Sequence, residues 1–202
     1  MIALIDYRAG NLTSVKKAFA TLGADLFVPT EAADLRNADA IVVPGVGHFA
    51  ATAALTPEWI DTIRAHVGAG RPLLGVCLGM QWLFDGSEEA PECAGLGLLS
   101  GLCYRLPAGS NGTSVKIPHV GWNALDVGRR DSIVDGVAPG AQVYFTHSFA
   151  APITADTVAI TEHGQAFAAV VQRGRVAGVQ FHPEKSGEVG LTILRNFLRL
   201  VH

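Results

Sequence analysis

A cysteine flanked by two glycines is the first candidate for chemistry. The segment Gly75-Val76-Cys77-Leu78-Gly79 has the form of a nucleophile elbow, in which the glycines let the chain turn sharply so that the central side chain projects. Unpaired N–H groups at the start of a following helix favour a thiolate, and the N–H of Leu78 would face the oxyanion formed when Cys77 attacks a carbonyl. A small buried cysteine at a strand end is the alternative. That alternative is preferred for Cys93 and Cys103, which lack such a setting.

A histidine and a glutamate near the C-terminus supply a candidate base. In Gln180-Phe181-His182-Pro183-Glu184, the proline biases His182 to an extended conformation, so that side chains two residues apart point the same way. A carboxylate beside an imidazole fixes its tautomer and stabilises the imidazolium that forms when it takes the thiol proton. The order Cys, His, Glu differs from that of α/β-hydrolases, which disfavours an esterase. A surface salt bridge is the alternative for this segment alone, and the cysteine upstream favours catalysis.

The elements around these residues predict an α/β fold, an open doubly wound and mostly parallel sheet with helices on both faces. Strands are expected at 2–6, 25–28, 40–43, 73–76 and 176–181. Helices are expected from about Asn11 to Gly23, from Thr56 to Gly70, after Cys77, and at the C-terminus with Leu191, Leu194, Leu198 and Val201 buried. Cys77 therefore falls where a strand stops and a helix begins.

The second half of the chain has a different pattern. Between 95 and 175, short β segments alternate with turns, which predicts an antiparallel region at one edge of the sheet. The Ser/Gly/Asn-rich stretch 107–114 is expected to be an exposed loop. Neither an internal repeat nor a linker divides the sequence, so we expect a single domain over 1–202.

Composition excludes several function classes. A chain of 202 residues with 49% hydrophobic content can bury a substantial core. Its formal net charge is −3, which argues against nucleic acid or an anionic membrane as the partner. No apolar run reaches the roughly 18 residues of a membrane helix, and no signal peptide is recognisable, so we expect a cytoplasmic protein. Three cysteines without C-x-x-C spacing predict neither a disulfide framework nor a metal site, and no cofactor is expected.

Two segments around these residues resemble a known family. GVCLGMQ at 75–81 and QFHPEKS at 180–186 resemble the class I, triad-type glutamine amidotransferases. PGVGHF at 44–49, KIPHVGWN at 116–123 and YFTHSF at 144–149 narrow the resemblance to the glutaminase subunits of imidazole glycerol phosphate synthase, which act in histidine biosynthesis. The resemblance runs from Ile2 into the last helix.

The resemblance implies a role for each residue of the motifs. Cys77 would form the glutamyl thioester, His182 would be the acid and base, and Glu184 would orient His182, so that glutamine gives glutamate and ammonia. The residues expected to bind the substrate or complete the oxyanion hole are Gly45, Val46, Gly47, Leu78, Gln81, His147, Ser148 and Phe149. Glycines on both sides of Val46 make a peptide flip inexpensive, which would switch an N–H into or out of the site. A plain glycine-rich turn is the alternative for that segment.

A partner is implied as well, because ammonia released into water is lost as ammonium. In the family, this subunit forms a heterodimer with a (β/α)8-barrel cyclase, which uses the ammonia to make imidazole glycerol phosphate and an aminoimidazole carboxamide ribonucleotide. The residues implied at the partner face are Asn11, Lys116, His119, Trp122 and Lys185. Taken singly, Lys185 is more often a solvated lysine and Trp122 more often a core residue.

The sequence departs from the family pattern at two positions. Phe149 stands where the family often has tyrosine, which removes any hydroxyl contact there. Arg8 stands where glycine is usual, so the conformation of the first turn is not predicted. Neither residue belongs to the predicted triad.

Three other functions compete with this interpretation. A stand-alone γ-glutamyl cysteine hydrolase can use a similar elbow, but Gln81 and KIPHVGWN disfavour it. A binding module that has kept the fold is disfavoured by the intact Cys77, His182 and Glu184. The glutaminases of other amidotransferases, such as those for anthranilate or guanylate synthesis, are the nearest relatives, and PGVGHF with KIPHVGWN favours the histidine pathway over them.

Overall fold

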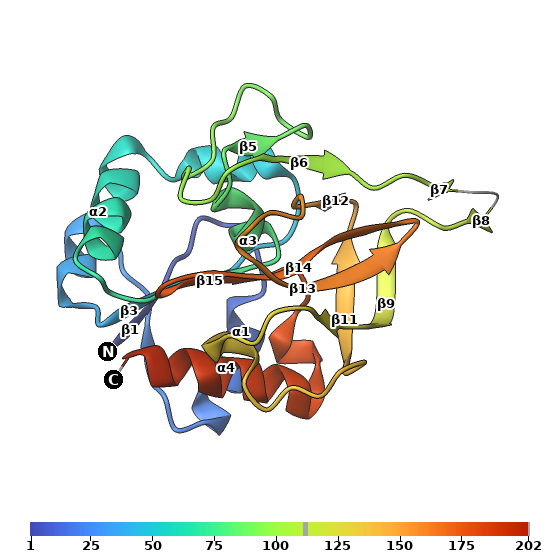
Figure 1. Cartoon of the computed structure of the whole chain (residues 1–202). Helices are drawn as coiled ribbons and strands as arrows, with labels where there is room; N and C mark the ends of the chain where they lie inside the picture. The colour runs from blue at the N-terminus through green and yellow to red at the C-terminus, as the bar shows by residue number, and fades with distance from the viewer. Residues whose placement is uncertain (111–112, 202) are drawn as a thin grey trace.

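The computed structural model describes residues 1–110 and 113–201. Its main sheet has the order β10-β13-β14-β15-β4-β3-β1-β2. Figure 1 labels five of these strands, β1, β3, β13, β14 and β15. The parallel strands are β1 (Ile2–Leu4), β2 (Leu26–Phe27), β3 (Ala40–Val43), β4 (Leu73–Val76) and β15 (Val176–Val179). The antiparallel strands are β14 (Gln165–Arg173), β13 (Thr157–His163) and β10 (Asp126–Val127). The predicted mostly parallel sheet with an antiparallel edge is confirmed.

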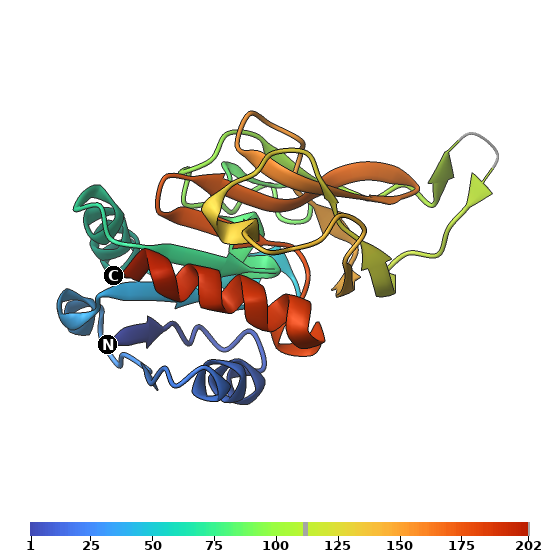
Figure 2. The ribbon, with the colours of Figure 1, turned by 60° about the horizontal axis from the view of Figure 1, so that its bottom comes forward.

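Helices cover both faces of this sheet (Figure 2). Helices α1 (Leu12–Thr21) and α4 (Gly187–Val201) pack on one face. The other carries α2 (Pro57–Gly68), α3 (Leu78–Trp82) and the 3-10 helices η1 (Ala32–Asn37) and η2 (Phe49–Ala54). Alternate strand residues face opposite layers, as a pleated strand requires: Ile2 and Leu4 contact the first layer, Ala3 and Ile5 the second.

The two helices of the first layer follow from local sequence signals. Asn11 caps α1 by accepting a hydrogen bond from the Ser14 N–H at 3.2 Å, as its position predicted. Phe19 meets Phe197 of α4 edge to face, with ring centroids 6.4 Å apart. In α4 the predicted Leu194 is buried, whereas Leu191 and Leu198 are only partly buried, because Ile193 and Phe197 fill the centre of the interface.

Smaller sheets lie beside the main one. Strands β9 (His119–Ala124) and β11 (Gln142–His147) form an antiparallel ribbon that pairs His119 with His147 and Trp122 with Tyr144. Strand β6 (Leu102–Arg105) pairs with β5 (Gly86–Ser87) and β12 (Phe149–Ala150). Strands β7 (Gly109–Ser110) and β8 (Thr113–Ser114) form a hairpin where a loop was expected, and residues 111–112 of that stretch lie outside the described part of the chain.

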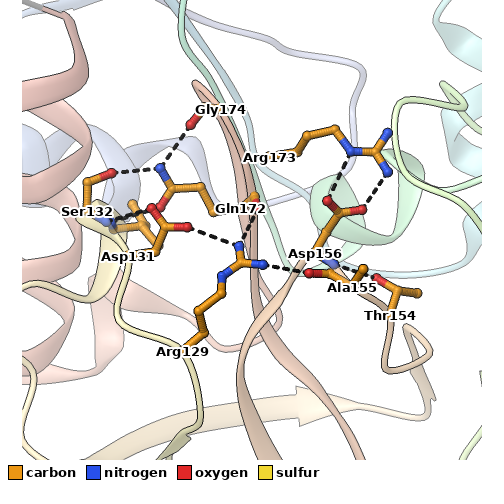
Figure 3. Close-up of polar contacts among 10 residues, drawn as sticks. Arg129, Asp131, Ser132, Thr154, Ala155, Asp156, Gln172, Arg173 and Gly174 are labelled. Carbon is orange, nitrogen blue, oxygen red and sulfur yellow. Dashed lines mark hydrogen bonds and ion pairs between the residues drawn. The ribbon is translucent and has the colours of Figure 1, made fainter.

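A polar network joins η3 (Ser132–Val134) to the end of β14 (Figure 3). The Gln172 side chain is buried, accepts from the Ile133 N–H at 2.9 Å, and donates to Ser132 Oγ at 2.7 Å and to the Gly174 carbonyl at 2.9 Å. Arg129 donates to the Gln172 carbonyl at 2.8 Å. One glutamine thus satisfies three polar groups on two segments.

Replacing Gln172 with methionine tests how much this network stabilises the fold. The buried Ile133 N–H loses its acceptor, so we expect Gln172→Met to lower the free energy of unfolding by about 1–3 kcal/mol. Urea unfolding followed by circular dichroism measures the change. Gln142→Met is the matched control, because Gln142 is exposed and its substitution should change stability by less than about 0.5 kcal/mol. Equal stability of the two variants would contradict the prediction.

Candidate active site

The chain turns at Cys77 between β4 and α3. Cys77 has φ 53° and ψ −108°, a left-handed conformation that costs a non-glycine residue about 1–3 kcal/mol. Its N–H still bonds to the Val179 carbonyl at 2.8 Å. Cys77 therefore stands at the carboxyl end of β4, which lies between β3 and β15 in the sheet. The predicted elbow is present. Helix α3 is shorter than expected, with five residues ending at Trp82, so few peptide dipoles align behind the sulfur.

His182 and Glu184 meet directly after β15. His182 is extended, and Pro183–Lys185 form a 3-10 turn that brings Glu184 Oε1 to 2.9 Å from His182 Nδ1. Both side chains are less than 5% exposed, at 3% and 4%. The backbone of His182 is fixed by Tyr144, whose carbonyl accepts from the His182 N–H at 2.9 Å, and by Ser186, whose hydroxyl donates to the His182 carbonyl at 2.6 Å.

The electrostatic setting keeps the His182 ring charged. Burial lowers the pKa of His182, but the nearby Cys77 sulfur and the hydrogen-bonded Glu184 carboxylate outweigh burial and raise the pKa from 6.5 to about 10. Among the described residues, His182 Nε2 has no hydrogen bond of ordinary geometry, although Cys77 lies close enough to affect its pKa. The Cys77 thiol has a weak contact with the Thr146 carbonyl at 4.0 Å. The ring is thus oriented on one side by Glu184 and free to act on the other.

A cavity of about 270 Å³ opens at Cys77. It is lined by Gly47, Cys77, Leu78, Gln81, Glu89, Pro118, Thr146, His147, Ser148 and Phe149. Six of the eight residues predicted to bind substrate are therefore on its wall. The other two, Gly45 and Val46, line a smaller cavity of about 70 Å³, together with His182, Glu184, Asn11 and Lys185.

The Leu78 N–H, which was expected to bind the oxyanion, is already bonded to the Gly45 carbonyl. Leu78 N–H donates to the Gly45 carbonyl oxygen at 3.3 Å, so that N–H is paired in this structure. Gly47 has φ 108° and open space where a Cβ would stand, which leaves this side of Val46 free to rotate. At Gly45 a Cβ would lie 1.9 Å from the Tyr7 hydroxyl, so glycine is required there.

The turn before α1 puts a non-glycine residue in a conformation that favours glycine. Arg8 has φ 63°, in the left-handed region, and its N–H bonds to Asp6 Oδ1 at 2.9 Å. Gly10 lies beneath the glycine-rich segment, where a Cβ would come within 3.3 Å of the Gly45 Cα. The turn therefore supports Gly45 from below, and Arg8 adopts the conformation at some cost in strain.

Most of the predicted partner-face residues are exposed. Trp122 is 57% exposed and meets the Tyr144 ring edge to face, and Lys185 Nζ lies 5.7 Å from the centre of the same ring. Asn11 and Lys116 are also exposed. His119 differs from these four, since its side chain is 3% exposed and packs against Phe145 and His163, and its place at the partner face stays a prediction. A strand of the ribbon turns alternate side chains inward, and His119 is on the inner side.

Two residues at the site had not been predicted. Glu89 lines the cavity and accepts from the Phe49 N–H at 2.8 Å, and no periodicity or motif indicated it. Gln180 is fully buried, with its side-chain nitrogen 3.6 Å from Cys77 Sγ. Its place in QFHPEKS was a signal, but its role depends on contacts that a local pattern does not give. Among the described residues no cluster of His, Cys, Asp and Glu could hold a metal ion.

Comparison with known proteins places this fold in a class of enzymes. The family described as glutamine amidotransferase class-I matches residues 3–201, and the chain belongs to it. A solved structure described as a glutamine amidotransferase superposes over 100% of this chain and 99% of its own, with a TM-score of 0.76 at 21% identity. PurLQS from Thermotoga maritima gives a TM-score of 0.73 at 18% identity, covering 100% and 98%. At such identities these structures support the fold alone.

Curated relatives identify the particular subunit. The imidazole glycerol phosphate synthase subunit HisH of Methanothermobacter thermautotrophicus is 41% identical, covering 100% of this chain and 99% of its own. The HisH subunit of Xanthomonas euvesicatoria pv. vesicatoria is 45% identical, covering 98% and 97%. Within the class, the chain belongs to these HisH subunits, the glutaminase subunits of imidazole glycerol phosphate synthase in histidine biosynthesis. In the described part of the chain, no helix is long and apolar enough to cross a membrane.

The raised pKa of His182 can be measured directly. We expect its ring to titrate near 10 in the wild type and at lower pH in Cys77→Ala, which loses the nearby sulfur that helps to raise the pKa. NMR of histidine-labelled protein follows the ring. Because the folded pKa exceeds the unfolded value of 6.5, the charged ring stabilises the fold fully below pH 6.5, and this contribution is lost as pH rises through about 10. A ring that titrates identically in both proteins would contradict the assigned cause.

Proposed function

We propose that Cys77, His182 and Glu184 form the catalytic triad of this glutaminase. The observation that carries the proposal is the buried His182–Glu184 pair, 2.9 Å apart, beside a strained cysteine that opens on a cavity. The Cys77 sulfur attacks the glutamine carboxamide carbon, and His182 protonates the leaving ammonia as the C–N bond breaks. Water then attacks the thioester, His182 takes its proton, and glutamate leaves as the C–S bond breaks.

The cavity wall provides groups that fit the amino-acid end of glutamine. The Gln81 side-chain nitrogen is already bonded to the Phe149 carbonyl at 2.7 Å and to Gln180 Oε1 at 3.1 Å, which leaves its oxygen for the substrate. We assign the Glu89 carboxylate to the α-ammonium group, because it is the one acidic side chain among the described residues that line the cavity. The backbone from His147 to Phe149 lines the opposite wall.

A (β/α)8-barrel cyclase is the partner that the chemistry of the pathway favours. It would accept ammonia at the face formed by the exposed Trp122 and Lys185 and the half-buried Tyr144 between them, which lies beside the triad. Asn11 and Lys185 line the same small cavity as Gly45 and Val46. This face therefore adjoins the segment that is expected to complete the oxyanion hole. Formation of imidazole glycerol phosphate from glutamine by the mixed subunits tests the pairing.

Replacement of the nucleophile separates the two half-reactions. Cys77→Ala should lower glutamine-dependent synthesis on the order of 10⁴-fold or more, while the complex still uses added ammonium salt, because only thioester formation needs the thiol. Steady-state assays of the complex with glutamine and with ammonium measure both. Cys93→Ser is the matched control and should keep both activities, since Cys93 is partly exposed and is not on the cavity wall. Glutamine hydrolysis in Cys77→Ala would refute the triad.

The pairing of Leu78 with the Gly45 carbonyl predicts a poor glutaminase in isolation. Loss of one oxyanion donor costs on the order of 10²–10³ in rate, so we expect the cyclase with its nucleotide to raise kcat by that order while KM changes little. Glutamine turnover measured with and without the partner gives the ratio. Val46→Ala keeps the Val46 N–H and should be stimulated, whereas Val46→Pro lacks it and should not. Stimulation of Val46→Pro equal to that of Val46→Ala would exclude a peptide flip.

A further inference from the structure

Gln180 lies against the nucleophile but has no part in the triad. It follows β15 directly, is fully buried, and its N–H bonds to the Ala169 carbonyl at 2.9 Å. Its side-chain Nε2 is 3.6 Å from Cys77 Sγ, and its Oε1 is 3.1 Å from Gln81 Nε2. Hydrogen bonds to sulfur are longer than those to oxygen, so the first distance is a contact between donor and acceptor.

The orientation of this amide is dictated by a backbone carbonyl. The Phe149 carbonyl can only accept, so Gln81 must present its NH₂ group there, at 2.7 Å. The second hydrogen of that NH₂ group then points to Gln180, which must present its oxygen to Gln81. The NH₂ group of Gln180 is thereby directed at Cys77. Two amides that are ambiguous when taken singly have one consistent arrangement together.

Two buried histidines stand behind the Phe149 carbonyl, from which this series of hydrogen bonds starts. His147 Nδ1 lies 2.9 Å from the Phe149 carbonyl and must donate to it, which leaves His147 Nε2 as the acceptor for His119 Nδ1 at 3.0 Å. His119 Nε2 then accepts from Asn123 Nδ2 at 3.2 Å. Both rings are neutral in this arrangement. Desolvation lowers the pKa of His119 to about 3 and that of His147 to about 4, in agreement with the geometry.

We propose that Gln180 is a further catalytic residue, whose side-chain N–H donates to the Cys77 sulfur and stabilises the thiolate that attacks glutamine. His119 and His147 are positioning residues, which act on Cys77 through the Phe149 carbonyl and Gln81. The proposal rests on Cys77 being the nucleophile. Gln180 forms no covalent bond and transfers no proton, since it keeps both amide hydrogens throughout.

The other groups around the sulfur make distinct contributions. His182, paired with Glu184, supplies positive charge. The Thr146 carbonyl, 4.0 Å away, favours the thiol because it can only accept. Tyr7 is buried nearby, and burial together with the charge of Cys77 raises its pKa far above the ordinary value, so its hydroxyl stays neutral. Gln180 is thus a neutral donor to the sulfur whose effect can be separated from that of the imidazolium by substitution.

The test is the pH dependence of Cys77 alkylation by iodoacetamide in the full chain, measured by mass spectrometry in a Cys93→Ser background. A hydrogen bond to a charged group is worth about 10- to 100-fold, so Gln180→Met should move the pH midpoint up by about one to two units and slow alkylation at pH 7 by about 10-fold or more. Gln172→Met is the matched control: another buried glutamine, outside the cavity wall, whose loss should leave the midpoint in place. An unchanged midpoint in folded Gln180→Met overturns the proposal.

A second measurement needs no substitution at Gln180. In the wild type, the side-chain ¹⁵N–¹H signals of Gln180 should shift with pH at the midpoint found for alkylation, since the acceptor changes from thiol to thiolate. Signals that do not follow Cys77 would overturn the proposal, even if Gln180→Met failed to fold. Neither measurement uses glutamine turnover, so failure here is distinct from failure of the triad, which the Cys77→Ala assay with glutamine detects.

Discussion

The contact between Gly79 and the Val43 carbonyl oxygen sets the geometry on which the site depends. A Cβ atom at position 79 would stand 1.8 Å from that oxygen, so a side chain there would push α3 away from the end of β3. At Gly75 a Cβ would stand 2.6 Å from the Gly79 carbonyl oxygen, which blocks the turn in the same way. With both contacts made, the chain reverses within one residue. Cys77 takes up the strain, and its sulfur reaches the edge of the sheet where His182 follows the neighbouring strand.

Burial lowers the pKa of three histidines at the site, and the groups that each ring contacts decide whether its pKa ends above or below the ordinary value. His182 faces a carboxylate and a sulfur, and its pKa rises to about 10. His119 and His147 face each other, and His147 also meets a backbone carbonyl, so desolvation prevails and their pKa values fall to about 3 and about 4. The positive charge is therefore confined to the ring that contacts the reacting thiol. The two rings behind it, His119 and His147, are neutral and held in one set of tautomers, which is what fixed positioning of a substrate requires.

Local patterns were enough for the parts of the molecule that local contacts determine. The bounds of β3 and β4, the Asn11 cap and the meeting of His182 with Glu184 all follow from residues within a few positions of one another. The burial of His119 was missed, because it depends on how the ribbon packs on Phe145 and His163. Gln180 and Cys77 are 103 residues apart, and no periodicity connects them. What the sequence could not supply is the register between distant segments, which the whole fold decides.

The pairing of Leu78 with Gly45 places two demands on one N–H. Leu78 is 1% exposed, and an empty oxyanion hole would leave its N–H unpaired at a cost of about 1–3 kcal/mol. The resting chain avoids this cost with the Gly45 carbonyl, and the same N–H can then stabilise an oxyanion only after that carbonyl turns away. A ligand shifts such a balance only by binding the turned state more tightly. Since Gly45 and Val46 share a cavity with Asn11 and Lys185, a partner seated on those two residues would contact the very segment that must turn.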